Sequence, residues 1–150
     1  MKVGIIVEPY EEKNASGIAQ CILNQSVGLM GLDKENDYII YTSTPFKKER
    51  LLGNTKNVLI PKSFLGKNFW FIKKSILDKT DVADILIFNM PLLPLVLPKR
   101  IKTIPVFYEL IYKAPGEQSL KKKILFGIQK NMIATALKRA THIITPSNAT

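Results

Sequence analysis

Cysteine is almost absent from this chain, which excludes an internal disulfide framework. The one cysteine, Cys21, lies among apolar residues at helical spacing, and this setting favours a small buried hydrophobic residue over a nucleophile. A lone thiol also fits a reducing compartment. With 46% hydrophobic residues, a chain of 150 residues can build one ordinary core without disulfides or a bound metal. We therefore expect a single cytoplasmic domain.

Long apolar runs are missing as well. The longest uncharged stretch, residues 85–98, is shorter than the roughly 20 residues needed to cross a bilayer, and its prolines would break a spanning helix. Residues 1–7 have a strand pattern and no signal-peptide cleavage site follows them. The sequence thus predicts neither a transmembrane segment nor a secretion signal. Residues 91–98, apolar and rich in proline, fit a core-lining loop, the alternative being an exposed apolar patch.

Acidic residues are few, since 12 Asp and Glu accompany 22 Lys and Arg, giving a formal net charge of +10. The basic excess forms clusters: Lys47, Lys48 and Arg50; Lys73 and Lys74; Lys99, Arg100 and Lys102; and Lys121, Lys122 and Lys123. Such a field attracts an anionic lipid surface, a phosphorylated substrate or nucleic acid, and the plainer alternative is a set of solvated faces. Because no nucleic-acid-binding motif accompanies the charge, we expect no nucleic-acid partner.

Apolar runs that are typical of buried strands alternate with helical patterns along the chain. Strands are predicted at residues 3–7, 37–43, 57–60, 85–88, 102–108 and 143–144. Helices are predicted from Ser16 and Gly17 to about Met30, at 68–79 and at 117–139, with a shorter helical or irregular piece at 46–52. This alternation predicts an α/β fold, a Rossmann-like open parallel sheet with helices on both faces.

In open parallel sheets, ligands bind beyond the carboxyl ends of the strands. The loop after the first strand ends at Ser16 and Gly17, and a single glycine there disfavours an NAD or FAD fingerprint. A helix N-terminus at Gly17 lets an anionic ligand approach backbone N–H groups, although nearby glutamates would repel it unless they face elsewhere. The alternative is that Ser16 and Gly17 only begin a helix. Zinc-ligand spacing, a Walker A loop and a serine nucleophile elbow are absent from the sequence.

The loop after the fifth predicted strand holds Glu109 between Tyr108 and Tyr112. A carboxylate in this position can orient a sugar hydroxyl or act as a base, and tyrosine rings suit the apolar faces of sugars. The alternative is that Glu109 only pairs with Lys113 on the surface. Near the end of the chain, a predicted strand at 142–145 leads to Ser147, a good helix N-cap, so we expect more of an α/β protein to follow.

Four segments carry a family resemblance: residues 17–19, 84–87, 103–115 and 140–147. In their order and spacing they resemble the N-terminal domain of GT-B-fold glycosyltransferases, in particular the retaining, metal-independent family 4 or group 1 type. The resemblance spans nearly the whole chain. It implies a nucleotide-sugar donor as co-substrate, no metal or other cofactor, and a C-terminal partner domain that holds most donor-binding residues. The isolated chain is therefore expected to be inactive.

The resemblance also implies roles for individual residues. Gly17, with Ser16, takes the position that approaches the donor phosphates, and Tyr10 and Tyr112 are candidate acceptor-binding residues. Tyr108 and Glu109 occupy the place of a His-Asp pair that lines the reaction centre, so they are the candidate catalytic residues. This pair departs from the family pattern, because tyrosine lacks the imidazole of histidine.

Membrane-associated members of the family touch the bilayer with basic and apolar surface, which implies a peripheral position on the inner face of the membrane. The candidate contact residues are Lys67, Trp70, Lys73, Lys74, Lys121, Lys122 and Lys123. The expected acceptor is a sugar or a lipid-linked sugar. A different class of function stays open, namely a stand-alone flavodoxin-like module that binds a small ligand or a protein without catalysis.

Overall fold

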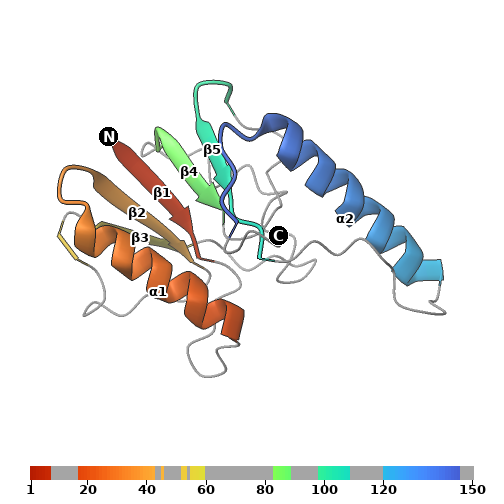
Figure 1. The fold of residues 1–150 in the computed structure, drawn as a ribbon, viewed down its shortest axis with the longest axis horizontal. Helices are drawn as coiled ribbons and strands as arrows, with labels where there is room; N and C mark the ends of the chain where they lie inside the picture. The colour runs from red at the N-terminus through yellow and green to blue at the C-terminus, as the bar shows by residue number, and fades with distance from the viewer. Residues whose placement is uncertain are drawn as a thin grey trace.

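A computed structural model gives the fold of the chain and describes residues 1–7, 17–42, 45, 52–53, 55–59, 83–88, 98–108 and 120–145. Within them the strands are β1 (Lys2–Ile6), β2 (Asp37–Thr42), β3 (Thr55–Leu59), β4 (Ile85–Phe88) and β5 (Lys102–Pro105), and the helices are α1 (Gly17–Leu32) and α2 (Leu120–Arg139). The five strands form one parallel sheet in the order β3-β2-β1-β4-β5 (Figure 1). The predicted open α/β sheet is confirmed.

β1 lies at the centre of the sheet and is buried on both sides. Its register pairs Ile5 with Ile40 of β2 and with Ile87 of β4, so these side chains share one face. Ile6, one residue further along, points to the opposite face and is 1% exposed. A strand buried on both faces needs a continuous apolar run rather than an alternating one, and the sequence of β1 has that form.

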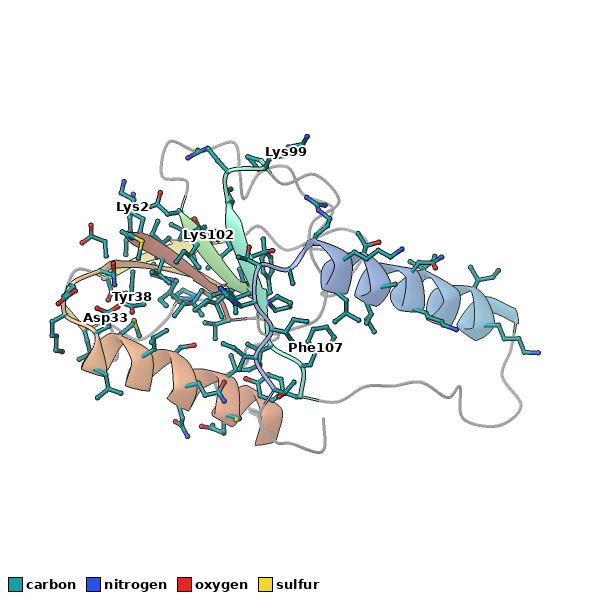
Figure 2. All side chains as sticks on the ribbon, turned by 45° about the horizontal axis from the view of Figure 1, so that its top comes forward. Lys2, Asp33, Tyr38, Lys99, Lys102 and Phe107 are labelled. Atoms are coloured by element: carbon teal, nitrogen blue, oxygen red, sulfur yellow. The ribbon has the colours of Figure 1, made fainter. Side chains whose placement is uncertain are left out.

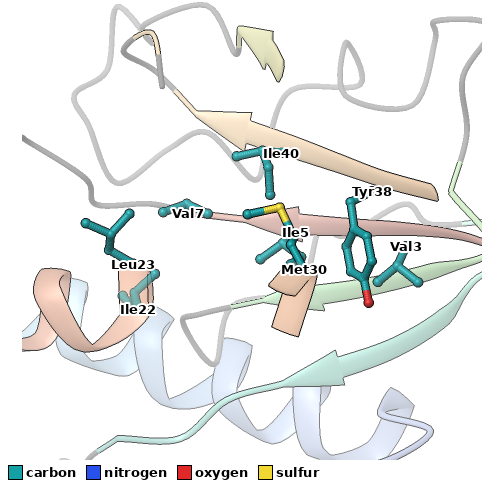
Figure 3. Close-up of a cluster of buried hydrophobic side chains, with 8 residues drawn as sticks. All are labelled: Val3, Ile5, Val7, Ile22, Leu23, Met30, Tyr38 and Ile40. Atoms are coloured by element: carbon teal, nitrogen blue, oxygen red, sulfur yellow. The ribbon is translucent and has the colours of Figure 1, made fainter. Parts of the chain in front are cut away.

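One face of the sheet is covered by α1. Ile22, Leu23 and Met30 of this helix pack against side chains of β1 and β2 in a single buried cluster (Figure 3), whose sheet members are Val3, Ile5, Val7, Tyr38 and Ile40. Ser26 lies on the same face, and its hydroxyl is satisfied by donating to the Ile22 carbonyl at 2.8 Å. The sequence pattern of this helix predicts one apolar face that includes Ile22, Leu23, Ser26, Val27 and Met30, and the structure confirms it at these positions.

The opposite face depends on the absence of a side chain at Gly4. A Cβ atom at this position would lie 2.5 Å from Leu86 Cδ2 and 2.9 Å from the ring of Tyr41. Both neighbours are nearly fully buried, as is Phe88 on the same face. Glycine at this position therefore allows β2 and β4 to fill the layer beside β1 with large side chains.

α2 contacts the sheet through its C-terminal end. Ala136 is fully buried, and the Thr103 hydroxyl of β5 donates to the Arg139 carbonyl at 3.2 Å. Toward the other end of the helix, Ile124 and Ile128 are 57% and 48% exposed, and Figure 1 shows the helix extending away from the sheet. Ile124, Ile128 and Ala136 belong to a row of apolar residues in which members recur every four positions. Such a row does not give one buried face, because each step of four turns about 40° around the helix.

Two predicted strand boundaries are wrong at the β5 edge. β5 ends at Pro105, short of the predicted residue 108, and the predicted strand at 143–144 is a single parallel bridge between Val106 and Ile144. Ile143 and Ile144 are 46% and 42% exposed. Because these side chains are this exposed, they lack the two covering layers that the pattern implied. The predicted pieces at 46–51 and 68–79 lie outside the described residues.

A network around Asp33 joins the end of α1 to the start of β2. The Asp33 carboxylate accepts hydrogen bonds from the Tyr38 hydroxyl at 2.6 Å, from the Asn36 side-chain amide at 2.7 Å and from the Glu35 amide at 2.9 Å. These bonds, with that from Tyr38 contributing most, lower the pKa of Asp33 from 3.8 to about 2. Burial of the phenol, together with the hydrogen bond to this carboxylate, raises the pKa of Tyr38.

We expect Gly4→Ala to destabilise the fold by about 1–3 kcal/mol, because the new methyl group overpacks the layer around Leu86. The matched control is Gly28→Ala in α1, where an added Cβ meets nothing within 4 Å and helix propensity should raise stability by up to about 1 kcal/mol. Urea denaturation of both variants measures the difference. Equal stability of the two variants would contradict the tight packing at Gly4.

We expect the Asp33 network to contribute stability that disappears in acid. The pKa of the folded carboxyl, about 2, lies below the unfolded value of 3.8, so folding is favoured above that value and loses this contribution as the pH falls from about 4 toward 2. Tyr38→Phe should raise the Asp33 pKa toward its ordinary value, and Asp33→Asn should remove the dependence. Carboxyl NMR titration and denaturation between pH 2 and about 5 test this, and an unchanged Asp33 pKa in Tyr38→Phe would refute it.

Candidate functional site

The strand order places a reversal between β1 and β4. From β1 the chain proceeds to β2 and β3 on one side, and it then returns to the other side with β4 and β5. In open parallel sheets this reversal separates the loops that leave the two central strands and creates a crevice at their carboxyl ends. The candidate site therefore lies beyond Val7 and Phe88. The loops that follow these strands, 8–16 and 89–97, are outside the described residues.

Gly17 begins α1 and is exposed. An added Cβ would meet no atom within 4 Å, and its φ is not in the left-handed region, so neither packing nor backbone conformation requires glycine here. The first turn of α1 contains no acidic residue. The N–H groups of a first helical turn have no partner within the helix, and together with the helix dipole they suit an anionic group.

Tyr108 joins the end of the β5 segment to α1. Its ring is half-buried against the α1 core cluster, and its hydroxyl donates a hydrogen bond to Gln25 Oε1 at 2.7 Å. Gln25 lies eight residues beyond Gly17, about 12 Å along the helix axis at 1.5 Å per residue. A single extended ligand can span this separation. Of the predicted site residues, Gly17 thus begins α1 and Tyr108 is hydrogen-bonded to the same helix.

The chemistry available to Tyr108 is that of a neutral phenol. Burial, with a smaller contribution from the nearby Cys21, raises the pKa of Tyr108 to about 12. At neutral pH the hydroxyl therefore stays protonated and donates a hydrogen bond rather than accepting a proton as a base. Cys21 itself is partly exposed rather than fully buried, in contrast to its predicted setting.

Gln25 is a contact residue that the sequence did not reveal. It is polar, exposed and placed on the border of the apolar face of α1, so its spacing carries no chemical signal. Only the folding of the β5 segment over α1 brings it to Tyr108, which is 83 residues away in the sequence.

Three of the candidate membrane-contact lysines lie on α2. Lys123 is exposed, and Lys121 and Lys122 belong to the same first turns of the helix. All charged residues of α2 are basic, and two of them, Lys138 and Arg139, lie in its last turn. The other predicted site residues lie outside the described part of the chain: Tyr10, Ser16, Lys67, Trp70, Lys73, Lys74, Glu109 and Tyr112.

Among the described residues, no group of three or more His, Cys, Asp or Glu side chains gathers in a way that could hold a metal ion. Neither α1 nor α2 is long and apolar enough to cross a membrane.

The sequence matches no protein-family model, and neither the curated proteins nor the solved structures contain a significant match to it. The candidate site is therefore defined by its own geometry. It combines an exposed helix N-terminus at Gly17, a neutral phenol at Tyr108 and the reversal of strand order between β1 and β4.

We expect Tyr108→Phe to destabilise the fold by about 0.5–1.5 kcal/mol, since it removes the hydrogen bond to Gln25 but keeps the packed ring. Gln25→Ala should then add little further loss to Tyr108→Phe, whereas Gln20→Ala, an exposed change on the same helix, should be additive. A double-mutant cycle by urea denaturation measures the coupling. Additive effects of Tyr108→Phe and Gln25→Ala would show that the bond contributes nothing.

Proposed function

We propose that this chain is the acceptor-side N-terminal domain of a retaining GT-B-type glycosyltransferase. In this proposal the enzyme transfers a sugar from a nucleotide-sugar donor to a glycan, a glycolipid or a lipid-linked acceptor, without a metal. The observation that supports it best is the open N-terminus of α1 at Gly17 beside the reversal of strand order between β1 and β4. That arrangement suits a ligand with a diphosphate.

The proposal divides the work between two domains. Most donor contacts would come from a C-terminal domain across a cleft, and Gly17, with Ser16, would let the donor phosphates approach the α1 backbone. Tyr10 and Tyr112 would contact the acceptor sugar, and Glu109 would orient a reacting hydroxyl. Tyr108, protonated at neutral pH and donating its one O–H to Gln25, would accept a hydrogen bond from a sugar hydroxyl through its phenol oxygen.

An anionic membrane surface is part of the same proposal. α2 carries only basic charges, and Ile124 and Ile128 are exposed on it. Basic side chains that flank exposed aliphatic ones suit peripheral contact with anionic lipid. In this arrangement Lys121, Lys122 and Lys123 of α2, with Lys67, Trp70, Lys73 and Lys74, would hold the enzyme at the cytoplasmic face, where a lipid-linked acceptor is found.

The test uses the complete gene product and a panel of radiolabelled nucleotide sugars, with transfer into the lipid and glycan fractions of membranes as the readout. We expect Gly17→Ala to lower transfer at least tenfold, because a methyl group would stand where the donor phosphates approach, while stability changes by about 1 kcal/mol or less. Gly28→Ala, a glycine of the same helix with equal space around it, is the matched control.

Two results would count against the proposal. Transfer that is equal in Gly17→Ala and Gly28→Ala would remove the role of Gly17. Absence of transfer from every donor of the panel, with a folded protein, would favour a binding module without catalysis.

A further inference from the structure

A cavity lies at the opposite edge of the sheet from the candidate site, at the amino end of β5. Its volume is about 200 Å³, and its lining residues are Pro98, Lys99, Ile101, Thr103 and Arg139. A cavity needs only about 10–15 Å³ to hold one water, so this one has room for a hydrated anion. We infer that this cavity, between Lys99 and Arg139, is a binding site for a phosphate group.

Among the described residues, the charged ones that line the cavity are both basic. Lys99 and Arg139 line it, and Arg100, Lys102 and Lys138 are exposed neighbours of these two in the chain. Figure 2 shows Lys99 and Lys102 at the same edge of the sheet as Lys2. Two acidic residues also lie at this edge: Asp37 begins β2, and Asp84 directly precedes β4, where its carboxylate accepts a hydrogen bond from the Lys2 amide at 2.9 Å. The potential at the cavity therefore favours an anion.

The types of the two cations also suit phosphate. Arginine offers a planar fork of N–H donors that can bind two phosphate oxygens together, and lysine supplies a compact charge on a flexible stem. Isolated charges on an open surface bind weakly because water screens them. Here a hollow brings two cations to a common space, and the side chain of Ile101, 6% exposed, forms part of its wall.

Both sides of the cavity are anchored to the sheet. The turn that carries Lys99 is closed by a hydrogen bond from the Ile101 amide to the Pro98 carbonyl at 3.1 Å. On the other side, Thr103 donates its hydroxyl to the Arg139 carbonyl, and its own carbonyl accepts the Thr141 amide at 2.8 Å. The backbones of Lys99 and Arg139 are thus held in place before a ligand arrives, which lowers the entropy lost on binding.

The C-terminal dipole of α2 opposes an anion here, since the last carbonyls of a helix carry partial negative charge. Two of these carbonyls already have donors: Arg139 accepts the Thr103 hydroxyl, and Ala136 accepts the Ala140 amide at 2.9 Å. Full positive charges on Lys138 and Arg139 also stand in the last turn. The basic side chains therefore outweigh the dipole at the cavity.

This site lies at the amino ends of the strands, whereas the crevice of the proposed transferase lies at their carboxyl ends. A phosphate group there would bind independently of any sugar transfer. Its source is either a soluble phosphorylated compound or a phospholipid headgroup, and both present the same chemistry to Lys99 and Arg139.

The test measures phosphate binding to the 150-residue chain by amide NMR at low salt, and vesicle binding by flotation with phosphatidylcholine alone or mixed with phosphatidylglycerol. We expect saturable shifts with inorganic phosphate at Ile101, Thr103 and Thr141, or retention on the anionic vesicles. Lys99→Gln with Arg139→Gln should weaken whichever binding is seen roughly tenfold, as expected for the loss of a charge-assisted hydrogen bond.

The matched control is Lys34→Gln with Lys56→Gln, which removes two exposed charges from the β2–β3 side of the sheet, away from the cavity at β5. It should change binding less than twofold. If Arg139→Gln unfolds the chain, Lys99→Gln alone serves, because Lys99 is exposed in a turn. Binding to phosphate supports a soluble ligand, and binding to anionic vesicles alone supports a headgroup. Equal losses in the two variant pairs, or no binding of either probe, would overturn the site.

Discussion

The position of β1 at the centre of the sheet is the constraint on which the rest of the structure depends. β1 is paired in parallel with β2 and β4, and β3 and β5 are added outside these two strands. A strand in this place must bury both faces and leave room for large neighbours, which it does through its aliphatic residues and Gly4. The candidate site is placed at the carboxyl edge because the chain continues from β1 in one direction and returns in the other.

Short polar contacts then hold the elements to this sheet. Asp33 connects the end of α1 to β2 through Tyr38, and Thr103 connects β5 to the end of α2 through Arg139 and Thr141. Each contact satisfies backbone or side-chain groups that would otherwise lie unpaired near the core. The second one has a functional consequence, because it carries Arg139 to the wall of the basic cavity.

The two edges of the sheet differ in chemistry. The carboxyl edge offers an open helix N-terminus at Gly17 and a protonated phenol at Tyr108, a setting for the proposed transfer of a sugar. The amino edge offers side-chain cations around a cavity at Lys99 and Arg139. The net charge of +10 is thus partly organised at positions where it can act on an anion, rather than spread evenly over the surface.

The sequence by itself determined the fold class and most strand positions, because a parallel sheet with two covered faces leaves a local signal in its aliphatic runs. The run at Ile85–Phe88 matches β4, and the apolar face with Ile22, Leu23 and Met30 matches the buried side of α1. The start of α1 at Gly17, which is one of the predicted site residues, was also predicted from the sequence. Only the tertiary structure decided the contact of Gln25 with Tyr108, the exposure of Ile124 and Ile128, and the placement of Lys99 and Arg139 around one cavity. These features join residues far apart in the chain, and spacing along one segment carries no information about which distant segment will pack against it.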